Sequence, residues 1–181
     1  MLVVAAITTF ISTFLILSFA RARIDLAQTA NLIVSDVRDA QTRVIANSQY
    51  NSTHRCGYGV TTGATPQSYR LYVGPDTSNA NCQSENRNFD ANDTIIRTVS
   101  LPDARLEIKQ ATPFQLFFDI FFEPPNPTTF INNVSSGAAP GRILIGPVGK
   151  VCDAKGVDCK AICVYASGKI ELPATLICPA N

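Results

Sequence analysis

The first twenty residues form an unbroken apolar run. Residues 1–20 have the sequence MLVVAAITTFISTFLILSFA, with no charged residue, no proline and no glycine. As an α-helix, this segment would be about 30 Å long, which matches the hydrocarbon thickness of a bilayer. A buried core helix and a cleaved secretory signal are the alternatives, but a cleaved signal normally begins with basic residues. The pattern therefore favours a transmembrane segment.

A second helical pattern follows without a break. The stretch from Arg21 to Ala46 contains no proline or glycine, and polar residues such as Asp25 and Asp36 fall mainly off its apolar stripe. The stripe recurs at intervals of three and four residues and consists of Leu26, Ala30, Ile33, Val37, Ala40 and Val44. This spacing is typical of an amphipathic helix. We therefore expect one helix of about 45 residues, roughly 70 Å long, whose second half packs on the rest of the chain.

After Tyr50 the helical period is lost, and short β-type runs alternate with turn residues. The expected strands cover residues 56–60, 68–73, 94–99, 105–109, 114–122, 142–146, 161–165 and 169–172. The densely apolar run at 114–122 is expected to be a central strand, and the runs at 142–146 and 161–165 are expected to pair. Residues 74–93 and 126–140 are rich in turn formers, so both are expected to be loops. The pattern predicts an α+β fold, with the long N-terminal α-helix packed on an antiparallel sheet or small sandwich.

The chain accordingly divides into a transmembrane segment (residues 1–20), an amphipathic helix continuation (21–48) and a disulfide-containing β domain (49–181). All six cysteines lie in the last part. An even number confined to a β domain predicts disulfides formed in an oxidising compartment. Many pairings are open, and local pairing predicts Cys56–Cys82, Cys152–Cys159 and Cys163–Cys178. A zinc site at Cys152, Cys159 and Cys163 is disfavoured, because their spacing lacks the paired CxxC pattern of zinc modules.

Charge gives no support for nucleic-acid binding. The net charge is +1, and 15 basic residues are scattered among 14 acidic ones. A nucleic-acid-binding protein normally clusters its basic residues on one face. Only 16% of the chain is charged, and uncharged polar residues are abundant. This composition fits an extracytoplasmic β-rich domain.

No group of residues in the sequence indicates catalysis or a cofactor. The single histidine, His54, lies two residues before Cys56, but a cysteine in a disulfide has no free thiolate to act as a nucleophile. Asp153 and Asp158 could offer oxygen ligands to Ca²⁺, although two carboxylates are few for a hard cation. No phosphate-binding glycine loop, zinc-protease motif or serine-hydrolase motif occurs. We therefore expect no enzyme, no cofactor, no metal site and no small-molecule substrate.

The start of the chain resembles a known family. The apolar run Met1-Leu2-Val3-Val4-Ala5-Ala6-Ile7 is similar to the hydrophobic stretch of type IV pilin-like proteins. The order of parts is also similar: an apolar segment, an amphipathic continuation through Arg21-Ala22-Arg23, and then a β domain. Within this superfamily, residues 56–60, 68–73, 99–102 and 166–171 resemble minor pseudopilins of the GspH/FimT type. The family's processing motif, with its glycine, aromatic residue and glutamate, does not precede Met1 here, and we expect it to lie in a leader upstream.

The resemblance implies a structural subunit of a fibre. The chain would be a minor pilin or pseudopilin of a type IV pilus or a type II secretion pseudopilus, made as a prepilin that is cleaved and N-methylated. It would wait as a single-pass protein in the lipid of the bacterial inner (cytoplasmic) membrane, with its β domain extracytoplasmic, and then join other pilin or pseudopilin subunits. Arg21 and Arg23 alone would place the β domain in the cytoplasm. The cysteines indicate the opposite side, and a basic leader would remove the conflict.

Assembly would use the apolar half of the helix. Small and hydroxyl-bearing residues let helices approach closely, and the expected assembly face consists of Ala5, Ala6, Thr8, Thr9, Ser12 and Thr13. The alternative function is that of a signal-anchored extracytoplasmic protein, whose β domain binds a ligand without assembling into fibres.

Overall fold

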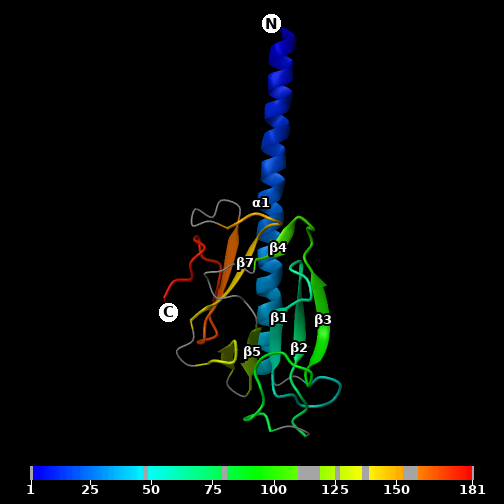
Figure 1. Ribbon diagram of the computed structural model, residues 1–181, viewed down its shortest axis with the longest axis vertical. Helices are drawn as coiled ribbons and strands as arrows, with labels where there is room; N and C mark the ends of the chain where they lie inside the picture. Colours follow the sequence, from blue (N-terminus) through cyan, green and yellow to red (C-terminus); the bar gives the residue numbers. More distant parts are fainter. Residues whose placement is uncertain are drawn as a thin grey trace.

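The chain folds into one long helix and two antiparallel sheets (Figure 1). The structure is a computed structural model that describes residues 2–46, 49–78, 81–109, 119–124, 127–135, 139–152 and 159–180. The helix, α1, spans Leu2–Ile45, and its side chains are described at Phe10 and from Asp25 onward. The N-terminal half of α1 projects away from the sheets, which surround the C-terminal half.

The two sheets are built from nine strands in the described part of the chain. The first sheet has the order β3 (Thr94–Ser100), β2 (Ser68–Val73), β1 (Tyr58–Thr62), β5 (Asp119–Glu123) and β6 (Thr128–Ile131). The second has the order β4 (Leu106–Ile108), β7 (Gly141–Pro147), β8 (Lys160–Val164) and β9 (Ile170–Glu171). Every pairing is antiparallel. The predicted α+β class with antiparallel sheets is therefore confirmed.

One hydrophobic core joins α1 to both sheets. Its largest fully buried side chains come from the helix (Ile33), from the first sheet (Tyr69 and Phe122) and from the second (Ile143 and Ile162). Strands β1 and β5 of the first sheet and β7, β8 and β9 of the second contact α1. Each sheet buries its apolar face on the same helix, so the helix is the element that holds the two sheets together.

Most expected strands lie where the pattern placed them. The strand predicted at 68–73 is β2, and the predicted pairing of 142–146 with 161–165 is the pairing of β7 with β8. Of the run predicted at 114–122, residues 119–122 belong to β5, an interior strand, and residues 114–118 lie outside the described residues. The loop expected at 126–140 was wrong in part, because β6 forms there and pairs with β5. Proline and asparagine residues flank this four-residue strand, so its local sequence is typical of a loop. Pairing with β5 stabilises it as a strand.

The membrane segment stays a prediction. Within the part of the chain whose side chains the structure describes, no helix combines the length and apolar content needed to cross a membrane. The predicted span, residues 1–20, lies in the part of α1 where Phe10 is the one side chain described. The division of the chain at residues 20 and 48 is likewise a prediction.

Candidate functional site at the interface of α1 and the sheets

The C-terminal half of α1 is seated on the sheets along one face. The predicted apolar stripe is buried at every position, from Leu26 at 6% exposed to Val37 at 0%. Thr29 shares this face, and its hydroxyl donates back to the carbonyl oxygen of Asp25 at 2.8 Å. A hydroxyl bonded within its own helix can be buried at little cost. The buried stripe therefore determines which side of α1 faces the sheets.

A carboxylate is buried in the same face. Asp36 is 5% exposed and accepts a hydrogen bond from the Tyr69 hydroxyl of β2 at 2.5 Å. Its other carboxylate oxygen accepts from the guanidinium of Arg97 on β3, which is half-exposed. Burial, followed by the bond to Asp36, raises the pKa of Tyr69 above its ordinary value, so this hydroxyl remains a donor. We name these three residues the helix anchor, since they tie α1 to two strands of the first sheet.

The helix anchor was missed from the sequence. Asp36 lies three residues after Ile33 and four before Ala40, both on the apolar stripe. Helical spacing alone therefore places it on the buried face, contrary to its assignment off the stripe. That spacing was the available signal. The partners Tyr69 and Arg97 gave none, because they are 33 and 61 residues away in the chain.

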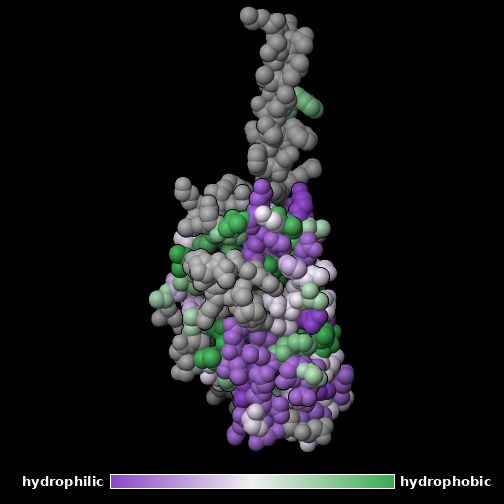
Figure 2. Space-filling model, viewed as in Figure 1, coloured by the Kyte–Doolittle hydropathy of each residue, from purple (hydrophilic) through white to green (hydrophobic). Residues whose placement is uncertain are grey.

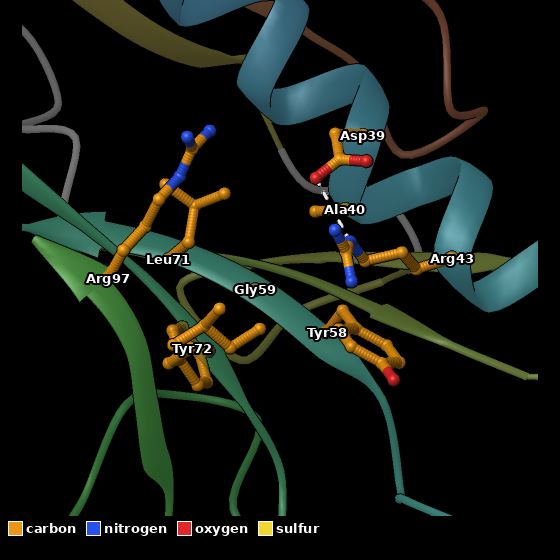
Figure 3. Close-up of a pocket in the computed structure, with 9 residues that line it drawn as sticks. Asp39, Ala40, Arg43, Tyr58, Gly59, Leu71, Tyr72 and Arg97 are labelled. Carbon is orange, nitrogen blue, oxygen red and sulfur yellow. Dashed lines mark hydrogen bonds and ion pairs between the residues drawn. The ribbon is translucent and has the colours of Figure 1, made fainter. Parts of the chain in front are cut away.

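A cavity of about 150 Å³ lies beside the helix anchor (Figure 3). It is lined by Asp39, Ala40, Arg43, Tyr58, Gly59, Leu71, Tyr72, Ile96 and Arg97. Arg43 and Arg97 lie on opposite sides of it, and Arg43 Nε donates to Asp39 Oδ2 at 3.0 Å. Burial raises the pKa of Tyr58, and nearby Arg43 partly opposes that rise. Each arginine already faces a carboxylate, and the lining contains no serine, cysteine or histidine, so these residues form no nucleophile–base pair.

A second buried carboxylate lies on the opposite face of the first sheet. Asp119 of β5 is 3% exposed and accepts from the Tyr72 hydroxyl at 2.5 Å and from the backbone N–H of Phe89 at 2.9 Å. Burial raises the pKa of Asp119 to about 7, although the bonds it accepts lower it in part. Asp119 therefore joins the loop after β2 to the middle of the sheet.

Arg87 also holds the loop that follows β2 in place. Arg87 donates from its guanidinium to the carbonyl oxygen of Cys82 at 2.9 Å and to the Glu123 carboxylate at 3.3 Å. Its guanidinium also lies 5.1 Å from the centre of the Phe130 ring, within the range of a cation–π contact. Hydrophilic residues dominate the surface at this end of the molecule, away from the projecting half of α1 (Figure 2). The loop expected at 74–93 contains no strand among its described residues.

Three disulfides join Cys56 to Cys82, Cys152 to Cys159 and Cys163 to Cys178. The expectation of disulfides is confirmed, and the pairs are those that local spacing predicted. The third bond ties the C-terminal segment, residues 172–180, to β8. Two hydrogen bonds assist it: Arg142 Nη1 donates to the Leu176 carbonyl at 3.0 Å, and the Tyr165 hydroxyl donates to the Pro179 carbonyl at 3.1 Å.

The other candidate residues are not brought into one site. His54 is exposed and contacts Gln49, and its neighbour Cys56 is oxidised. Asp153 and Asp158 lie outside the described residues. Among the residues that are described, no group of three or more potential ligands could hold a metal ion.

The expected assembly face also lies outside the described side chains. Its members are Ala5, Ala6, Thr8, Thr9, Ser12 and Thr13, all within α1. Their role remains a prediction.

Comparison with known proteins places this architecture in a structural class. A long N-terminal helix whose C-terminal half is seated on antiparallel sheets is a type IV pilin-like fold. A crystal structure of the type IV minor pilin FimU of Pseudomonas aeruginosa strain PAO1 shares it with a TM-score of 0.50 and 13% sequence identity, over 86% of this chain and 97% of that one. No protein-family model matches the chain, and no curated protein matches it either.

Proposed function

We propose that this chain is a minor subunit of a type IV pilus or a type II secretion pseudopilus and assembles through the N-terminal half of α1. The likeness of its fold to the minor pilin FimU, over 86% of the chain, is the observation that carries the proposal. The arrangement of α1 supports it, because one half of the helix is committed to the β domain and the other projects from it. A projecting helix is available to pack against the helices of other subunits.

The sequence of the projecting half suits both lipid and a helical bundle. Residues 1–20 carry no charge, so a bilayer can hold them before assembly. Once subunits stack, the small residues from Ala5 to Thr13 would let neighbouring helices approach closely and replace lipid contacts with protein contacts. The partners are then other pilin or pseudopilin subunits.

The disulfides support an extracytoplasmic β domain. Three disulfides persist only where the surroundings are oxidising, as outside the cytoplasm. In this proposal the subunit spans the inner membrane once before assembly, with its β domain on the non-cytoplasmic side. After assembly it would lie in the fibre.

Site-specific photo-crosslinking in the native cell tests assembly. A photo-reactive residue at Ser12, on the expected assembly face, should give adducts with another pilin-like subunit. The same residue at Val134, which is 48% exposed in the β domain, serves as a control that reports contacts away from the helix. The Ser12 adduct should disappear when the assembly motor is deleted, because the subunit then remains alone in lipid.

A different result would favour the alternative function. If Ser12 gives no protein adduct while the chain remains in the membrane, the helix serves only as an anchor. The chain would then be a signal-anchored binding protein.

A further inference from the structure

A turn with two exposed valines follows strand β7 of the second sheet. Val151 is 88% exposed and Val148 is 46% exposed, and Lys150 between them is exposed as well. A single exposed valine is ordinary on a protein surface. Here, however, the pair is presented by a tight turn in which Lys150 N–H donates to the Pro147 carbonyl at 3.1 Å and Gly149 has a φ of +69°. We name residues 148–151 the proximal turn.

The proximal turn is held in position by β4. Val148 N–H donates to the Arg105 carbonyl at 2.7 Å, and Gly149 N–H donates to the Glu107 carboxylate at 3.2 Å. The Lys109 ammonium donates to the Pro147 carbonyl at the base of the turn. Both valine side chains remain exposed on this turn. The turn is therefore a fixed feature of the second sheet.

Arg105, which directly precedes β4, connects this region to a defined position along α1. The Arg105 guanidinium donates to the Asp25 carboxylate at 3.0 Å. Asp25 lies five residues after Ala20, the last residue of the predicted span, which corresponds to about 8 Å along the helix. In Figure 1, β4 lies at the end of the sheets from which the N-terminal half of α1 projects. The proximal turn thus faces the side on which the membrane would lie.

The distance of about 8 Å between the end of the predicted span and Asp25 matches the thickness of the lipid headgroup layer. The polar layer on each side of a bilayer is about 5–8 Å thick, so Asp25 would lie at its outer edge. Transmembrane helices are tilted by about 20° on average. A tilt toward the second sheet would bring the proximal turn into this layer. Lys150, which is exposed, would then face lipid phosphates, and its positive charge favours anionic lipid. Arg105 is already paired with Asp25 and Asp103.

We propose that the proximal turn is a second membrane contact, which rests on the headgroup layer while residues 1–20 span the bilayer. The proposal rests on the membrane anchorage that is part of the proposed function. The occupant is a lipid surface, because the turn combines two exposed apolar side chains with an exposed lysine at the level of the membrane surface. The contact fixes both the direction in which α1 tilts and its rotation about its own axis.

The sequence offers a clean test, since the chain contains no tryptophan. A single tryptophan is introduced into the full chain at Val151, at Val134 or at Phe10, giving V151W, V134W and F10W. Each protein is reconstituted into vesicles of zwitterionic and anionic lipid whose acyl chains carry bromine close to the headgroup, and F10W also into vesicles whose acyl chains carry bromine near the bilayer centre. Bromine quenches tryptophan only at short range. V134W is the matched control, because Val134 is also exposed but follows β6, which lies with β5 near the C-terminal end of α1.

We expect V151W to be quenched at least about twofold more strongly than V134W, as for a side chain at the membrane interface. F10W should be quenched by the bromine near the bilayer centre, because Phe10 lies in the middle of the predicted span. Adding Lys150→Glu to V151W should weaken the quenching in anionic vesicles, since the charge then repels the surface.

The outcomes separate the two proposals. If F10W is quenched and V151W is no more quenched than V134W, the anchor stands and the proximal turn does not touch lipid. If F10W is not quenched either, both the span and the membrane contact are refuted.

Discussion

Asp36 is a carboxylate that the periodicity of α1 places in an apolar face. It remains there because Tyr69 and Arg97 supply hydrogen bonds to it. A buried polar group that loses a partner is costly. Water can replace the half-exposed Arg97 guanidinium more easily than the buried Tyr69 hydroxyl. The two bonds of the helix anchor should therefore differ in their contribution to stability.

Replacing Tyr69 by phenylalanine tests this. Tyr69→Phe should lower the free energy of unfolding by about 1–3 kcal/mol, because it leaves a buried carboxylate oxygen without its donor. Arg97→Gln is the matched control and should cost about 0–1 kcal/mol, since the arginine is half-exposed. Urea denaturation of the purified full chain measures both. Equal losses would contradict the unequal roles of the two bonds.

Asp119 makes stability depend on pH. Its pKa is about 7 in the folded protein, compared with an ordinary value of 3.8. The folded state therefore keeps this proton to a higher pH than the unfolded state. The free energy of unfolding should fall as pH rises from about 4 to about 7 and then level off. Asp93, whose pKa burial raises to about 6, contributes a smaller fall of the same sign.

Asp119→Asn should remove most of that fall, because the amide does not titrate. Asp76→Asn is the control: bonds from Ser78 lower the pKa of Asp76, so its replacement should leave the fall between pH 4 and pH 7 in place. Urea denaturation at a series of pH values measures the slopes. An unchanged slope in Asp119→Asn would assign the effect to other groups.

Among the elements, the C-terminal segment depends most on a covalent bond. Residues 172–180 are joined to β8 by Cys163–Cys178 and by two hydrogen bonds to their carbonyl groups. Closing a loop with a sequence separation of 15 stabilises a fold by about 3 kcal/mol. The double variant Cys163→Ala, Cys178→Ser should lose about that much stability.

Limited digestion with chymotrypsin should also cleave this double variant after Leu176, which is buried in the intact protein. The pair Cys152→Ala, Cys159→Ala is the control, because it opens a different loop and leaves the segment attached. Cleavage of both variants at the same rate would show that the hydrogen bonds suffice to hold the segment.

How far sequence predicts these elements depends on whether their signals are local. The stripe from Leu26 to Val44 and the alternation of residues 68–73 are local patterns, and both were found. The strand β6 was not, because four residues between turn formers become a strand only through pairing with β5. The helix anchor and the Tyr72–Asp119 bond join residues 33 to 61 positions apart, and no period within one segment encodes such a pairing.

For the whole molecule, the ends of the long axis differ. The projecting half of α1 forms one end, and the other carries the hydrophilic loop that Arg87 holds (Figures 1 and 2). The sequence predicted the order of these parts along the chain. It could not predict that Arg105, which directly precedes β4, pairs with Asp25, because that contact follows from how the second sheet docks on the helix.

The seating of α1 against both sheets determines how the molecule bears mechanical load. Strands β1 and β2 run roughly along the helix axis (Figure 1). A pull on the N-terminal end of α1 therefore acts in shear, and the buried contacts from Leu26 to Val44 resist it together rather than in succession. The Asp36–Tyr69 bond joins α1 to β2 near the middle of this stretch. Tension along the helix would consequently reach the β domain without first peeling the helix away from it.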